Sequence, residues 1–163
     1  MDINKLLNSI FFPRKTDFDT DDKDHLVNVD SDTSVGIRLF IKDNDYPTIL
    51  FFHANAEIAH EYDDIAEMYN QYNINFIVAG YRGYGISNGT PNKDNSLSDS
   101  LKIFAYVKEY LKTLRNTNKI VVMGRSLGST SACHIMNNNE NEVDGAIIDS
   151  GFATEYPFLL RFG

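Results

Sequence analysis

Hydrophobic residues along this chain form short continuous runs, and amphipathic stretches separate one run from the next. Continuous apolar runs occupy residues 47–53, 74–79, 119–124 and 143–149. Runs of this kind are typical of strands that are covered on both faces of a parallel sheet. Apolar residues near helical spacing mark residues 56–72, 96–114 and 127–137. The alternation predicts an α/β fold: a doubly wound, mostly parallel sheet with right-handed crossovers and helices on both faces.

A different pattern precedes this alternation. Two short β-type runs, 26–29 and 35–42, flank a turn rich in Asp, Ser and Thr, which predicts a β-hairpin. Residues 1–14 mix apolar and polar positions, so we expect a short amphipathic helix that docks on the body. The alternative is a peripheral membrane contact through the apolar side of this segment. No apolar run approaches the roughly 18 residues of a spanning helix, and no signal peptide is recognisable.

Length and composition indicate one domain, residues 1–163, in a reducing compartment. The formal charge of −8 argues against nucleic-acid binding, which needs clustered cations. The single cysteine, Cys133, excludes an intramolecular disulfide, is expected to be a small buried hydrophobe, and fits a cytoplasmic protein. The four histidines lack metal-ligand spacing, and the Gly-rich loop 80–91 lacks the patterns of a phosphate cradle. We therefore expect no cofactor and no metal.

One motif carries a specific chemistry: Gly124-Arg125-Ser126-Leu127-Gly128. It follows an expected buried strand and opens an expected helix, which is the context that a nucleophile elbow requires. A serine on such a strained turn needs small residues two positions to either side, and the helix N-terminus directs N–H groups at a developing oxyanion. The plain alternative is that Ser126 only caps the following helix.

Three separated blocks resemble the α/β-hydrolase superfamily, specifically its small, dienelactone-hydrolase-like serine hydrolases. The blocks are Phe51-Phe52-His53-Ala54-Asn55-Ala56, Tyr81-Arg82-Gly83-Tyr84-Gly85 and Gly124-Arg125-Ser126-Leu127-Gly128-Ser129. A weaker fourth block is Ile148-Asp149-Ser150-Gly151-Phe152. The resemblance covers nearly everything after residue 35, in family order. It implies the N-terminal two-thirds of an α/β-hydrolase fold, preceded by the β-hairpin and truncated after the sixth strand.

The resemblance also implies roles for residues that match the family motifs. Ser126 would be the nucleophile, and the backbone N–H groups of Leu127 and Asn55 would form the oxyanion hole. His53 would shape the oxyanion loop. Ala54 stands where the family prefers Gly, which could strain the loop if that position needs a positive φ. Asn55 is, from its position before the segment 56–72, also a plausible helix N-cap.

A triad acid and base are not identifiable in this chain, because in the family both follow the strand 143–149. Without a positioned imidazole a serine hydroxyl is a weak nucleophile near neutral pH. Two residues could substitute. Asp149 ends the last strand beside the elbow strand and could be the acid, or could have a structural hydrogen-bonding role. His53 is a possible surrogate base, and packing under the oxyanion loop is the alternative.

The end of the chain suggests an interaction between chains. The strand 143–149 would form a sheet edge although its composition is that of a covered strand. The tail 152–162 contains many apolar side chains that would have little to pack against. We expect a homodimer, or pairing with a partner chain, across this strand and tail.

Three functions remain open at this point. The first is a serine hydrolase that acts on a small-molecule ester or thioester. The second is a catalytically inactive relative that serves as a binding or assembly protein, for example as a dimer. The third is a truncated product of a longer hydrolase. The location is expected to be cytoplasmic, or membrane-associated if residues 1–14 contact a lipid surface.

Overall fold

A computed structural model describes residues 10–151 of the 163-residue chain. A helix or a membrane contact is expected within residues 1–14. Residues 1–9 of this segment lie outside the described residues, and residues 10–14 are not helical. The tail 152–162, with its expected role in an interface, also lies outside the described residues.

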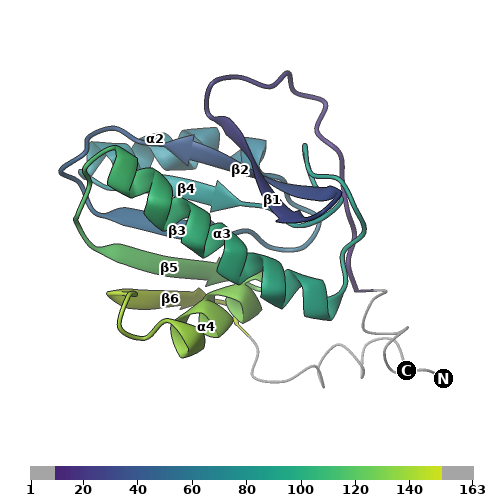
Figure 1. The fold of residues 1–163 in the computed structure, drawn as a ribbon. Coiled ribbons are helices and arrows are strands. Elements are labelled where there is room, and N and C mark those ends of the chain that lie inside the picture. The colour runs from purple at the N-terminus through teal and green to yellow at the C-terminus, as the bar shows by residue number, and fades with distance from the viewer. Residues whose placement is uncertain (1–9, 152–163) are drawn as a thin grey trace.

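The described residues form one six-stranded mixed sheet with the order β1-β2-β4-β3-β5-β6 (Figure 1). The strands are β1 (Asp24–Asp30), β2 (Thr33–Phe40), β3 (Thr48–Phe52), β4 (Asn75–Ala79), β5 (Ile120–Arg125) and β6 (Gly145–Asp149). β1 and β2 form an antiparallel hairpin, β2 pairs antiparallel with β4, and the remaining pairs are parallel. This arrangement confirms the expected α/β fold and its N-terminal hairpin.

Helices cover both faces of the sheet. They are the short 3₁₀ helix η1 (Ala59–Tyr62), α2 (Asp63–Gln71), α3 (Lys93–Thr113) and α4 (Gly128–Asn138). α3 and α4 lie on one face, and η1 and α2 lie on the other (Figure 1). The pleat of β3 divides its apolar side chains between two cores: Leu50 and Phe52 pack under α3 and α4, whereas Ile49 and Phe51 pack under η1 and α2.

The helix predicted for residues 56–72 begins later, at Ala59, and becomes α-helical at Asp63. Ala56 has φ 62°, a left-handed conformation that a right-handed helix cannot include. The expected N-cap role of Asn55 is therefore wrong, since neither helix starts beside it. α3 begins earlier than the expected residue 96, because Asn92 caps the helix by accepting a hydrogen bond from the Asn95 N–H.

Two expectations about burial also change. Four apolar residues indicated the helix over 56–72. Ile58 is buried, whereas the exposed fractions of Ile65, Met68 and Tyr72 are 41%, 58% and 77%. The buried position of α2 is Ala66, so the apolar stripe does not face the sheet. Cys133 is exposed, because the buried side of α4 is formed by smaller residues and Ile135.

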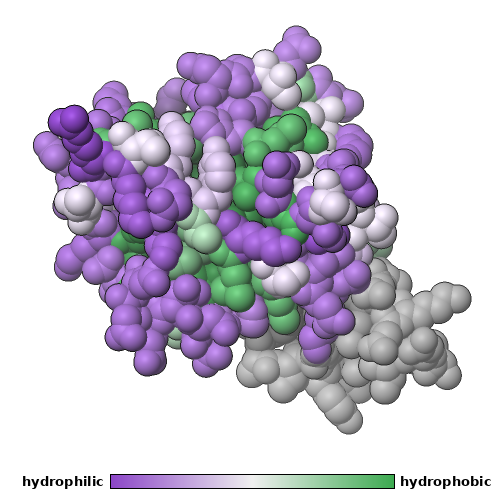
Figure 2. All heavy atoms as spheres, in the orientation of Figure 1, coloured by the Kyte–Doolittle hydropathy of each residue, from purple (hydrophilic) through white to green (hydrophobic). Residues whose placement is uncertain are grey.

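β6 is an edge strand among the described residues, as expected, and its Ile147 and Ile148 are 43% and 44% exposed. On the face that carries α3, hydrophilic side chains surround patches of hydrophobic ones (Figure 2). Within residues 10–151, no helix combines the length and the hydrophobicity that crossing a membrane requires.

Candidate active site

Ser126 occupies a tight turn between the end of β5 and the start of α4. Its φ is 49°, which is uncommon for a residue with a side chain and stores strain. The Ser126 N–H donates to the carbonyl oxygen of Asp149 on the neighbouring strand (2.9 Å), and the Ser126 carbonyl accepts from the Ser129 hydroxyl (2.6 Å). The turn is thus held from both sides, and the side chain is half-buried at the carboxyl end of the sheet.

The two glycines of the motif are required by close backbone contacts. A Cβ atom at Gly128 would overlap the carbonyl oxygen of Phe52 and lie 2.6 Å from its carbonyl carbon. A Cβ atom at Gly124 would overlap the carbonyl oxygen of Gly128 and lie 2.7 Å from the Cα atom of Ser129. Side chains at either position would therefore push α4 away from β3 and β5. The close approach explains why the turn carries glycine two residues to each side of Ser126.

In the loop after β3, the backbone N–H of Asn55 has no acceptor among residues 10–151, whereas its neighbours are hydrogen-bonded. The N–H of Ala54 donates to the Glu57 carboxylate (2.8 Å), and the N–H of Ala56 donates to the Asn55 side chain (2.9 Å). No hydrogen bond among residues 10–151 uses the N–H of Asn55 or of Leu127. The loop after β3 and the elbow after β5 lie at the same end of the sheet, because Phe52 of β3 pairs with Gly124 of β5 in parallel.

The strain expected at Ala54 lies elsewhere in this loop. Ala56, two residues further on, has the positive φ, and Ala54 does not. The departure from the family's preferred Gly at position 54 therefore has no steric consequence here.

His53 is fully buried beneath this loop. Its Nδ1 lies 2.8 Å from the carbonyl oxygen of Ala54, and the rings of Tyr81 and Tyr84 pack against it. Burial lowers the pKa of His53 below its ordinary value, so the neutral imidazole is favoured. No hydrogen bond joins His53 to Ser126 within the described residues. These contacts fit the packing role, and the role of a surrogate base stays a prediction.

Asp149 contacts the elbow mainly through its backbone. Its carboxylate lies 3.6 Å from Nε of Arg125 and accepts a hydrogen bond from the Ser150 hydroxyl (2.9 Å). Arg125 also lies 3.4 Å from the Glu57 carboxylate, so it bridges the elbow and the oxyanion loop. The acid role of Asp149 remains a prediction, since these bonds equally fit the structural role.

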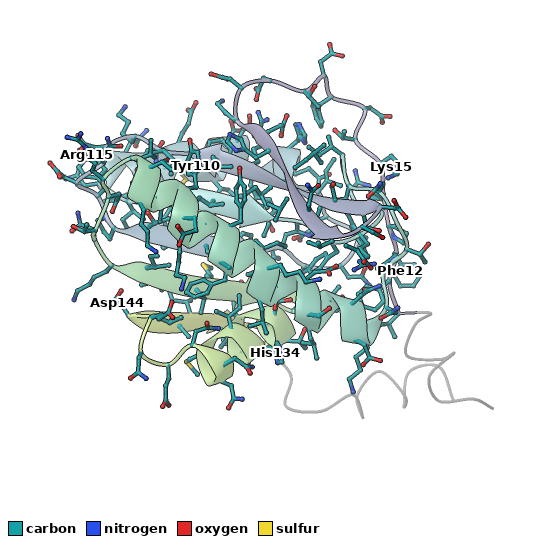
Figure 3. All side chains as sticks on the ribbon, viewed as in Figure 1. Phe12, Lys15, Tyr110, Arg115, His134 and Asp144 are labelled. Atoms are coloured by element: carbon teal, nitrogen blue, oxygen red, sulfur yellow. The ribbon has the colours of Figure 1, made fainter. Side chains whose placement is uncertain are left out.

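No histidine within residues 10–151 hydrogen-bonds Ser126 or Asp149. The side-chain partners of the other three histidines are Tyr106 for His25, Asp24 for His60 and Asn138 for His134. His134 lies on α4 (Figure 3). The described residues place a strained serine and the unbonded N–H groups of Asn55 and Leu127 at the same end of the sheet, and no imidazole among them forms a hydrogen bond with Ser126. Among the same residues there is also no group of three side chains suited to hold a metal ion.

Residues that hold the loop after β3 were not among those predicted from the sequence. The Phe12 N–H donates to the Asn55 side chain (3.0 Å), and the Arg14 guanidinium donates to the Ala56 carbonyl (2.8 Å). The Tyr84 hydroxyl donates to the same Asn55 oxygen (2.6 Å). Only the tyrosine carried a signal, as part of a family block. The other contacts join residues more than 40 positions apart.

Known proteins resemble this chain in both sequence and fold. Residues 44–157 match the family described as serine aminopeptidase, S33. Over 109 residues the chain is 32% identical to protein bem46 of Schizosaccharomyces pombe and 34% identical to the alpha/beta hydrolase domain-containing protein WAV2 of Arabidopsis thaliana. Each alignment covers 66% of this chain but only 36% and 35% of those proteins. The chain thus spans about a third of the length of these relatives.

The fold also matches a solved structure. A soluble variant of monoglyceride lipase from Saccharomyces cerevisiae superposes with a TM-score of 0.70 at 13% sequence identity. The match covers 88% of this chain and 50% of that one. At this identity the likeness establishes the fold.

Proposed function

Since this chain belongs to the α/β-hydrolase superfamily, we propose that it carries the nucleophile and the oxyanion hole of a serine hydrolase that acts on esters or thioesters. The observation that carries the proposal is the conformation of Ser126. A serine with φ 49° between two glycine positions that admit no side chain is costly for stability. An ordinary helix cap needs neither feature, which favours a nucleophile over the capping alternative.

The reaction would proceed in two steps. In the first, Oγ of Ser126 forms a bond to the substrate's carbonyl carbon, and the bond from that carbon to the alcohol or thiol breaks. The Oγ proton passes through a base to the leaving group. In the second, water cleaves the acyl-serine ester and the acid is released. The N–H groups of Asn55 and Leu127 would donate to the oxyanion in both steps.

The reaction needs a base to accept the Oγ proton, and no base among residues 10–151 hydrogen-bonds Ser126. The second candidate function, a catalytically inactive binding or assembly protein, is favoured by one observation. Each of the four histidines has a hydrogen-bond partner other than Ser126.

Labelling with a fluorophosphonate probe separates the two candidates. An activated serine hydrolase reacts with such a probe, so the wild-type chain should gain one phosphonyl group and the Ser126→Ala variant none. Ser131→Ala is a suitable control, since Ser131 is a buried serine on α4 whose hydroxyl has no hydrogen-bond partner among residues 10–151. Folded wild-type protein that stays unlabelled would refute catalysis by this chain and favour the inactive relative.

A further inference from the structure

Residues 10–15, here called the N-terminal strap, cross the sheet at the carboxyl ends of β3 and β5. Figure 3 shows Phe12 and Lys15 at this end of the sheet and Arg115 and Asp144 at the opposite one. The strap is anchored by Phe11, which is 8% exposed and belongs to the core under α3. It is also anchored by its backbone, because the Gly85 N–H donates to the Arg14 carbonyl (2.7 Å).

The strap forms hydrogen bonds with both the oxygen and the nitrogen of the Asn55 side-chain amide. The Asn55 oxygen accepts from the Phe12 N–H (3.0 Å), and the Asn55 nitrogen donates to the Ile10 carbonyl. The Tyr84 hydroxyl donates to the same Asn55 oxygen and accepts from the same Phe12 N–H. The Asn55 side chain therefore has no freedom to rotate while the strap is in place.

A second contact fixes the residue after Asn55. The Arg14 guanidinium donates to the Ala56 carbonyl (2.8 Å) and pairs with the Glu61 carboxylate (2.9 Å). Ala56 is the strained residue of the loop, and such a conformation persists only where the surrounding contacts impose it. The strap supplies those contacts, and the Asn55 N–H has no acceptor among residues 10–151.

We infer that the N-terminal strap is a positioning element for the oxyanion hole, because it locks the Asn55 side chain and the Ala56 carbonyl and thereby fixes the Asn55 N–H. Arg14 and Tyr84 are positioning residues in this scheme and do not touch the reacting atoms. The inference rests on the proposed function for its catalytic consequence. The strap's hold on the loop can be measured without it.

The experiment combines amide exchange with the rate of Ser126 labelling in Arg14→Ala, Arg14→Lys and Tyr84→Phe. Arg14→Ala and Tyr84→Phe should each speed exchange of the Ala56 amide at least tenfold, whereas the Val122 amide in β5 keeps its wild-type rate. Both variants should also slow fluorophosphonate labelling of Ser126 at least tenfold. Arg14→Lys retains a cation that can donate to the Ala56 carbonyl, so it should recover part of each loss.

Lys112→Ala is the matched control, because it removes another exposed ion pair, with Glu109, far from the strap. It should change neither readout. Equal acceleration of the Ala56 and Val122 amides would mean that the strap only stabilises the whole fold, and would overturn the inference. Unchanged Ala56 exchange would overturn it as well. Absent labelling of wild type refutes the proposed function instead, and the exchange ratio then decides the strap's role alone.

Discussion

Replacing Gly128 by alanine tests whether the elbow depends on the close approach of α4 to β3. The new Cβ atom would overlap the carbonyl oxygen of Phe52 and lie 2.6 Å and 2.9 Å from its carbonyl carbon and Cβ. Non-bonded carbon atoms are at their optimum about 3.5–4.0 Å apart. The start of α4 must therefore move by roughly 1 Å from a strand in the centre of the sheet.

The expected cost follows from two opposing contributions. Overpacking a well-packed site costs about 1–3 kcal/mol. The upper end applies here, since the obstacle is strand backbone that cannot change rotamer. Alanine recovers at most about 1 kcal/mol of helix propensity over glycine. The free energy of unfolding should thus fall by about 2 kcal/mol, a large part of the roughly 5–15 kcal/mol typical of a domain.

Urea denaturation followed by circular dichroism measures this loss, and Gly145→Ala is the control. A Cβ atom at Gly145 would meet nothing closer than a Val121 methyl carbon at 3.8 Å, an ordinary contact. That substitution in β6 should be neutral or slightly stabilising. If Gly128→Ala is as stable as Gly145→Ala, the packing argument for the glycine motif is wrong.

Three further substitutions have defined outcomes. Ser126→Gly should be more stable than Ser126→Ala by about 1 kcal/mol in urea denaturation, because only glycine adopts φ 49° without strain; equal stabilities would contradict the strain. The pKa of His53 is lowered by burial from its ordinary 6.5, so the unfolded chain binds the extra proton. The unfolding free energy should therefore fall below about pH 6.5, by at most about 1.4 kcal/mol per pH unit, and be insensitive to this group above it. His53→Phe should flatten that slope, and an unchanged slope would assign it to other groups. Asp99→Asn should cost about 3 kcal/mol in the same assay, since Asp99 is buried and accepts two bonds from Arg82 (2.7 and 2.9 Å); a loss within error would show that the pair is not stabilising.

Local patterns of apolar residues predicted the strands of the sheet. The apolar runs correspond to β3, β4, β5 and β6. β3 and β4 are buried along their whole length, and strands covered on both faces are apolar at nearly every position. The elbow followed from the motif and its context. The alternation of strands and helices predicted the parallel sheet, and the family resemblance implied the edge position of the strand 143–149, which is β6.

Helix boundaries and side-chain contacts could not be predicted in the same way. The backbone of Ala56 turns left-handed, and nothing in an alanine signals this. The stripe of Ile65, Met68 and Tyr72 had the right period for a helix but lies on its exposed side. Periodicity identifies a helix without saying which side meets the sheet when small residues such as Ala66 pack closest.

The oxyanion loop shows the same limit at the candidate site. Its sequence block indicated where the loop would be, while its hydrogen bonds come from Phe12 and Arg14, more than 40 residues earlier. Such contacts depend on how the strap lies across the finished sheet. Local patterns carry no information about them.

A crystal structure of the chain after reaction with a fluorophosphonate would locate both the nucleophile and the oxyanion hole. We predict phosphorus bonded to Oγ of Ser126, with the phosphonyl oxygen about 2.7–3.1 Å from the backbone nitrogens of both Asn55 and Leu127. Phosphorus on another residue, or a phosphonyl oxygen that accepts no hydrogen bond from these two N–H groups, would contradict this prediction.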